Sequence, residues 1–219
     1  MFLDPDDEYE SDYCEVMYDI ITENNLNLVK SNSKTIMGSK EYKNYYFNKD
    51  IDKKIITSKD EPLKYVAIWN GIHKYEFIVK NDIYFPTEIF GEDIFFTIKE
   101  FLCIDKFLYL NNYFGYRYFN RESSHAKSPS VENVCNIIKV FYITNDLCKE
   151  YEREEVSNFV LGTQITGVYL RIINVEKFKE RTRLLKQLYK FVKINPNLVV
   201  PSPIYKISQF LLSKKLIYI

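Results

Sequence analysis

The sequence predicts an α+β protein, in which a small mixed sheet with packed helices is followed by an all-helical C-terminal part. Three observations support this class. Short segments of the first half alternate apolar and polar residues, as strands do. Other segments, including all of those after residue 130, repeat their apolar residues at helical spacing. Hydrophobic residues make up 46% of the 219 residues, enough for a core of ordinary size.

The first 30 residues are expected to hold an acidic end and a hairpin. Residues 1–15 are rich in Asp and Glu, so a flexible N-terminus is expected there. Residues 16–21 fit a strand or a short helix, and residues 26–30 fit a second strand. Asn24 and Asn25 between them tolerate left-handed turn geometry. Together these segments suggest a β-hairpin.

Helices and short strands are expected to alternate from residue 33 to residue 120. Ser33 is the expected N-cap of a helix through Phe47, and residues 51–57 suit an exposed sheet edge. The later elements are expected in this order: a helix begun by Asp60-Glu61-Pro62 and ended by Asn70-Gly71, a strand over 75–79, a turn at Asn81-Asp82, a helix begun by Glu92-Asp93, a break at Ile104-Asp105 and a helix over 107–114.

The second half is expected to be helical after a polar linker over residues 121–130. Ser130 is the expected N-cap of a helix through Lys149, at the start of a C-terminal domain over 131–219. The remaining helices are expected over 156–173 (in one or two pieces), over 175–194 and, after Pro201-Ser202-Pro203, over 204–212.

Three segments, taken in order, resemble a BTB/POZ domain over residues 16–120. They are Leu26–Tyr42, with a strand followed by the start of a helix; Pro62–Gly71, which ends Trp-Asn-Gly; and Glu100–Asp105, which reads Glu-Phe-Leu-Cys-Ile-Asp. The sequence departs from the family at Asn32, where a His is usual, and at Lys43, where an aromatic residue is usual. Residues 131–219 are similar to the BACK-like helical extension of this family, and the short chain with its residue bias is similar to BTB proteins of large DNA viruses.

The resemblance implies an intracellular, cytoplasmic protein-interaction module without enzymatic activity. It implies a homodimer whose surface lies around residues 16–21 and 26–29, and an adaptor that binds a protein partner, a cullin among the candidates, in a ubiquitin ligase complex with a viral host-interaction role. The surface that faces the protein partner is expected near residues 69–75 and 107–116. Its candidate residues are Trp69, Tyr75, Phe107, Tyr109, Tyr113 and Tyr116.

No residue pattern predicts catalysis, a metal site or a cofactor. None of the four cysteines has a second cysteine at the spacing of a zinc or redox motif, and nothing marks His73 or His125 as half of a nucleophile pair. Gly162 and Gly167 have the first spacing of a phosphate loop, but Val168 stands where the loop needs Lys. Without a signal peptide or an apolar run of about 18 residues, an intracellular location and no membrane span are expected.

The distribution of charge marks one basic segment whose surface has two interpretations. The 30 basic and 30 acidic residues balance, which argues against a dedicated nucleic-acid binder. The segment 177–193 is nevertheless basic, and it places its cations on the helical face opposite its apolar residues. That face is either solvated or a surface for phosphate or an acidic partner, and the second reading makes the protein a regulator that binds nucleic acid or an acidic partner. The basic patch consists of Lys179, Arg183, Lys186, Lys190 and Lys193.

Overall fold

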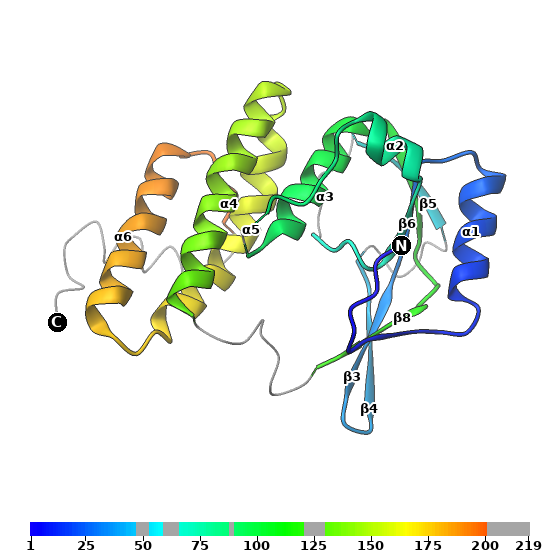
Figure 1. Ribbon diagram of the computed structural model, residues 1–219, viewed down its shortest axis with the longest axis horizontal. Helices are drawn as coiled ribbons and strands as arrows, with labels where there is room; N and C mark the ends of the chain where they lie inside the picture. The colour runs from blue at the N-terminus through cyan, green and yellow to red at the C-terminus, as the bar shows by residue number, and fades with distance from the viewer. Residues whose placement is uncertain (47–52, 59–65, 88–89, 121–129, 201–219) are drawn as a thin grey trace. The chain divides into compact units, whose positions relative to one another are not determined.

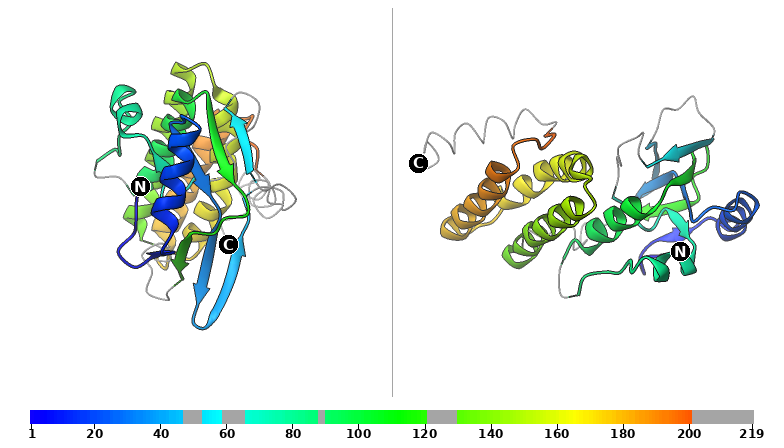
Figure 2. Two further views of the ribbon diagram at one scale, coloured as in Figure 1. Left: turned by 90° about the vertical axis from the view of Figure 1, so that its right-hand side faces the viewer. Right: turned by 90° about the horizontal axis from the view of Figure 1, so that it is seen from above.

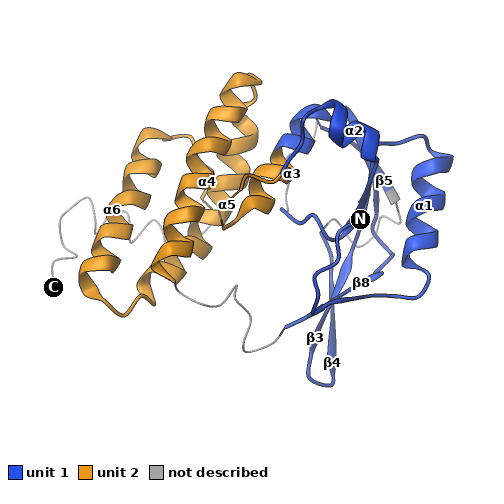
Figure 3. Cartoon of the chain, in the orientation of Figure 1, with its two compact units in different colours: residues 1–84, 99–124 blue, residues 85–98, 125–219 orange. Residues whose placement is uncertain are grey.

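The computed structural model describes residues 1–46, 53–58, 66–87, 90–120 and 130–200 (Figure 1). The chain divides into two compact units, residues 1–84 with 99–124 (unit 1) and residues 85–98 with 125–219 (unit 2), as Figure 3 shows. Unit 1 holds the strands, and unit 2 is helical among its described residues. The α+β class with a helical C-terminal part is therefore confirmed. The predicted domain boundaries at residues 16, 121 and 131 stay predictions.

Unit 1 contains two small mixed sheets where one was expected. In each sheet the two central strands are parallel, and each edge strand pairs antiparallel to its neighbour. The first sheet has the order β1 (Glu8–Tyr9), β8 (Tyr116–Phe119), β3 (Ser33–Met37), β4 (Lys40–Asn44), and the second has the order β5 (Lys53–Thr57), β7 (Lys106–Leu110), β2 (Leu28–Ser31), β6 (Gly71–His73).

Two stretches of chain pass from one sheet to the other. β2 continues into β3 through the single residue Asn32, whereas β7 continues into β8 through residues 111–115. Ser31 is paired with Leu110 before this crossing, and Ser33 is paired with Tyr116 after it. One residue on the first stretch therefore spans the same gap as five on the second.

Helix α1 (Tyr13–Glu23) covers one face of the sheet that contains β2 and β7. Tyr13, Met17 and Ile21 are buried and follow each other at four-residue spacing, so they form one apolar face. They pack in a core cluster with Leu26, Val29, Leu108 and Leu110. The hairpin expected from residues 16–21 is therefore absent, since these residues belong to α1, and Asn25, at φ 45°, follows the end of the helix.

Three other predicted elements differ in type. The helix expected from Ser33 is the hairpin β3–β4, because Gly38, at φ +59°, supplies the left-handed turn. The strand expected over 75–79 is helix α2 (Tyr75–Lys80). The helix expected over 107–114 begins as strand β7, whose four consecutive buried residues are typical of a central strand with both faces covered.

Most helix ends and turns follow the expected residues. α3 (Glu92–Cys103) starts and ends as predicted, β5 lies at a sheet edge, and Asp82 takes the left-handed turn conformation. Residues 66–70, where the Pro62 helix was expected to end, are not helical. The first part of that helix, the linker residues 121–129 and the predicted segment 204–212 lie outside the described residues.

Unit 2 is built around three helices that pack against each other, α4 (Val131–Glu150), α5 (Glu154–Ile173) and α6 (Phe178–Ile194), as Figures 1 and 2 show. Ser130 caps α4 as predicted, because its side chain accepts a hydrogen bond from the Asn133 backbone N–H at 3.4 Å. Phe141 of α4 and Phe191 of α6 meet in the core, with ring centroids 5.5 Å apart. Because α5 is one continuous helix, Gly162 lies mid-helix and belongs to no phosphate loop.

Candidate functional site

A groove of about 490 Å³ runs along the solvent face of α6. The described residues that line it are Phe178, Lys179, Thr182, Arg183, Lys186, Gln187 and Lys190. The opposite face of the helix carries Leu184, Leu188 and Phe191, which are buried in the core of unit 2. The amphipathic pattern therefore orients four cations of the predicted basic patch into one groove, while Lys193, the fifth, does not line it.

Basic side chains outnumber acidic ones on α6. Glu180 is the one acidic residue of α6, and its carboxylate lies 2.8 Å from the Arg183 guanidinium. Lys179 and Lys190 form no ion pair with any described residue. A chain with no net charge thus concentrates cations on one helix face, which is the electrostatic condition for binding an anion.

A second hollow, of about 520 Å³, lies where α4 begins, α5 ends and α6 begins. Arg183 connects this hollow to the groove, since it lines both. The second lining is more polar and carries both signs of charge. It consists of Ser130, Val131, Asn174, Val175, Glu176, Lys177, Glu180 and Arg183.

A different group of ionisable side chains is buried in unit 1. His73 Nδ1 lies 2.6 Å from Glu100 Oε1, and the two side chains are only 3% and 1% exposed. His73 Nε2 lies 3.1 Å from the Ile68 carbonyl oxygen. Because a carbonyl oxygen only accepts, Nε2 is the donor in this contact. Both ring nitrogens are therefore engaged, and the pair anchors the segment before β6.

Lys30 completes this buried group. Its ammonium donates to the Ala67 carbonyl oxygen, and burial lowers its pKa from 10.5 to about 8, against the opposing effect of Glu100. Sequence reasoning did not single out Lys30, although a lysine in a strand of apolar residues was a visible signal. Its role in this arrangement is to hold residue 67 against β2.

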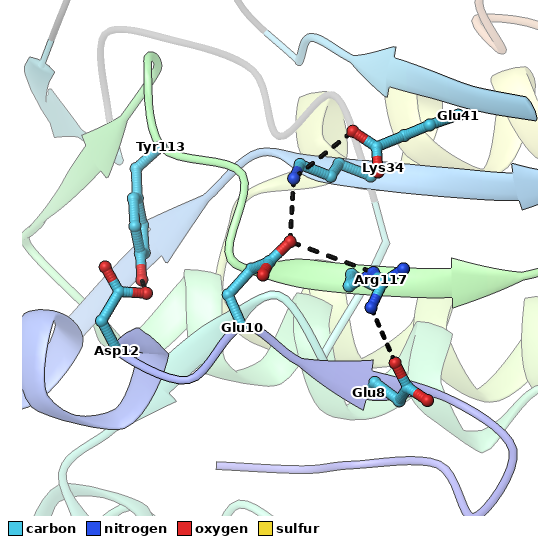
Figure 4. A network of polar contacts seen from close by, with 7 residues as sticks. All are labelled: Glu8, Glu10, Asp12, Lys34, Glu41, Tyr113 and Arg117. Carbon is cyan, nitrogen blue, oxygen red and sulfur yellow. Dashed lines mark hydrogen bonds and ion pairs between the residues drawn. The ribbon is translucent and has the colours of Figure 1, made fainter.

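The acidic N-terminal residues are bound to the first sheet (Figure 4). Glu10 accepts from Lys34 at 2.8 Å and Glu8 from Arg117 at 2.9 Å. Asp12 accepts from the Tyr113 hydroxyl at 2.8 Å, a contact that adds to the effect of desolvation in raising the pKa of Tyr113. A flexible segment was expected over residues 1–15, whereas these contacts hold Glu8 and Glu10 against the first sheet. Their basic partners lie on strands distant in sequence.

The residues predicted to face a protein partner do not form one surface. Phe107, Tyr109 and Tyr116 are buried, each no more than 3% exposed. Tyr113 and Trp69 are partly buried, with the Trp69 ring 4.3 Å from the Tyr116 ring. Tyr75 is 76% exposed. A helix over 107–114 would have left one face of that segment exposed, whereas strand β7 buries both Phe107 and Tyr109.

The described residues show neither a metal-binding cluster nor a membrane-spanning helix. No three His, Cys, Asp or Glu side chains among them come together in a way that would hold a metal ion. None of the described helices combines the length and the apolar character needed to span a membrane.

Comparison with known proteins gives a likeness of fold. No family model and no curated protein sequence matches the chain. Among solved structures, it is similar to TarS 1–349 of S. aureus in complex with UDP-GlcNAc, with a TM-score of 0.54 and 18% identity over 91% of this chain. It is also similar to a longer structure of S. aureus TarS, with a TM-score of 0.52 and 18% identity over 88% of this chain. The chain spans 57% of the first structure and 33% of the second.

This likeness corrects the function expected from the sequence. The structures that share the fold belong to TarS, a glycosyltransferase, and one of them holds UDP-GlcNAc. The predictions of a cullin adaptor, of a basic-helix regulator, of a ubiquitin-ligase or host-interaction role and of a protein without enzymatic activity are therefore wrong. The BTB/POZ resemblance and the homodimer stay predictions. At 18% identity the likeness shows the fold alone.

Proposed function

We propose that this chain is a nucleotide-sugar transferase domain that binds UDP-GlcNAc or a related UDP-sugar. The observation that carries the proposal is the fold shared with the UDP-GlcNAc complex of TarS over 91% of the chain. This chain spans 57% of that structure, and we propose that it both binds the nucleotide sugar and transfers the sugar.

The chemistry of such a transfer sets requirements that the described residues meet in part. The bond between the sugar C1 and the diphosphate oxygen breaks, its electron pair leaves with UDP, and an acceptor hydroxyl forms the new bond and loses its proton. Negative charge grows on the leaving diphosphate, so fixed cations nearby lower the barrier. The chain offers a group of four cations of this kind on α6: Lys179, Arg183, Lys186 and Lys190.

Binding and turnover test this function directly. The chain is titrated with UDP-GlcNAc, UDP and free GlcNAc by isothermal calorimetry, and release of UDP from UDP-GlcNAc is followed with and without sugar acceptors. We expect both nucleotides to bind and free GlcNAc to bind far more weakly, since the diphosphate supplies the charged contacts. Absence of UDP and UDP-GlcNAc binding at millimolar concentration would contradict the proposal.

An intracellular location is part of this proposal. All four cysteines are free thiols, and Cys14 is exposed, a state that is stable in a reducing compartment. Fractionation of cells that express the tagged chain, followed by thiol labelling before and after lysis, checks this expectation. Labelling of the thiols in intact cells by an impermeant reagent would oppose it.

A further inference from the structure

We infer that the two hollows that share Arg183 form one ligand site, in which the basic groove holds the diphosphate of a nucleotide sugar and the adjoining hollow holds the sugar. This inference rests on the proposed function and adds where the ligand binds. It concerns unit 2 alone, since every residue in both linings belongs to that unit.

The spacing of the groove cations fits a diphosphate. Lys179, Arg183, Lys186 and Lys190 follow each other at intervals of four, three and four residues, so they stand on one helical face. Side chains at these intervals begin about 5–6 Å apart, so a diphosphate can contact cations from two successive turns. Arg183 adds a planar fork that donates to two phosphate oxygens at once.

The lining of the second hollow fits a hydroxyl-rich group. Asn174, Glu176 and Glu180 bring amide and carboxylate groups, which donate to and accept from sugar hydroxyls. Carboxylates would repel a phosphate placed there, so the charge pattern assigns the diphosphate to the groove and the sugar to the hollow. The Arg183–Glu180 ion pair, at 2.8 Å, lies where the two halves meet.

The sizes and the exposed apolar surface agree with a small molecule. Hollows of about 490 and 520 Å³ lie within the range of about 300–1,000 Å³ that small-molecule sites occupy. Phe178 lines the groove and is 51% exposed. The Arg181 guanidinium lies 5.6 Å from the centre of the Phe178 ring, and the exposed part of that ring offers apolar surface to a nucleotide base.

A matched pair of double variants tests the diphosphate half. Lys186→Gln with Lys190→Gln removes two charges from the groove. Lys139→Gln with Lys149→Gln removes two exposed charges from unit 2 that lie outside both linings and outside the basic patch. We expect the groove variant to weaken binding of UDP and of UDP-GlcNAc by about tenfold or more, and the control variant to change it by less than about twofold.

A single variant tests the sugar half. Glu176→Gln keeps the size of an exposed side chain in the second hollow but removes its charge. It should weaken binding of UDP-GlcNAc more than binding of UDP, because only the former carries a sugar. Equal effects on both ligands, or none, would remove the sugar from this hollow and overturn that half of the inference.

The outcomes separate this inference from the proposed function. If the wild-type chain binds UDP-GlcNAc and both double variants bind it equally well, the ligand site lies elsewhere and the inference fails, while the proposed function stands. If the wild-type chain binds pyrophosphate but neither UDP nor UDP-GlcNAc, the proposed function fails and with it the nucleotide-sugar site. Groove-dependent binding of a single-stranded oligonucleotide that UDP does not displace would also overturn the inference.

Discussion

Lys30 shows how burial changes the chemistry of a single side chain. It is fully enclosed in unit 1, and loss of hydration lowers its pKa from 10.5 to about 8. Below pH 8 the folded protein therefore holds a buried cation whose desolvation opposes folding. Between about pH 8 and 10.5 the folded state has released this proton while the unfolded chain still binds it, so the free energy of unfolding rises with pH in this range.

Lys30→Met should remove this rise. In the wild-type chain this rise in the free energy of unfolding should be on the order of 3 kcal/mol between pH 8 and 10.5, and in the variant it should be absent. Urea unfolding at a series of pH values measures the difference. Lys40→Met is the matched control, because Lys40 is exposed on β4. If the free energy of unfolding of Lys30→Met rose with pH as steeply as that of the control, Lys30 would not be the buried cation that releases its proton in this range.

Asn32 is a second residue whose role follows from its position between the sheets. Its amide nitrogen donates to the Asn111 carbonyl, its side-chain oxygen accepts from the Tyr46 backbone N–H at 3.1 Å, and its own N–H donates to Tyr113 at 3.0 Å. Asn32→Ala should lower the free energy of unfolding by about 3 kcal/mol, because it leaves buried backbone groups without partners.

Asn197→Ala is the comparison for Asn32→Ala. Asn197 is exposed in unit 2, so its truncation should change the free energy of unfolding by less than about 0.5 kcal/mol. Chemical unfolding of both variants gives the two values. If both variants lowered the free energy of unfolding by similarly small amounts, the hydrogen bonds of the Asn32 side chain would not stabilise unit 1. The sequence showed Asn32 only as a departure from a family pattern, since its partners lie up to 81 residues away.

At the scale of elements, the prediction succeeded where the signal was local. The Ser130 cap, the acidic start of α3 and the left-handed turn at Asp82 depend on neighbouring residues, and the structure has all three. Type was mistaken where a short apolar run suits a strand as well as a helix, as over 107–110 and 75–79. The groove on α6 was anticipated as a basic face, but its concave shape depends on packing that periodicity does not encode.

The glycines of α5 give a prediction about helix packing. A Cβ built at Gly162 would lie 2.3 Å from the Val199 carbonyl oxygen, whereas one at Gly167 would meet no atom within 4 Å. Gly162→Ala should lower the free energy of unfolding by about 1–3 kcal/mol, because the backbone around residue 199 must move. Thermal or urea unfolding monitored by circular dichroism measures the change.

Gly167→Ala provides the internal comparison on the same helix. Alanine is favoured over glycine in a helix by about 1 kcal/mol, and no contact opposes it at this exposed position, so stability should rise. The two substitutions are chemically identical and should differ in sign. If both raised stability, the contact between α5 and residue 199 would not be part of the fold in solution.

At the scale of the whole molecule, the site assigned to unit 2 predicts where ligand binding slows hydrogen exchange. A ligand that binds only the folded state stabilises it by about 2.7 kcal/mol at a hundred times its dissociation constant. With UDP-GlcNAc, peptides from 174–190 should gain the most protection, and peptides from β3 and β4 should gain the least. Protection centred on unit 1 would place the ligand there, and exchange followed by mass spectrometry distinguishes the two patterns.

The crossing of β2–β3 and β7–β8 between the sheets has a consequence for how unit 1 comes apart. β2 and β3 lie at the centres of the two sheets and are joined by a single residue, so displacement of β2 from β7 pulls directly on β3 in the other sheet. Under a pulling force, the two sheets should therefore rupture in one event of a force–extension trace, with no intermediate length at which only one sheet has given way.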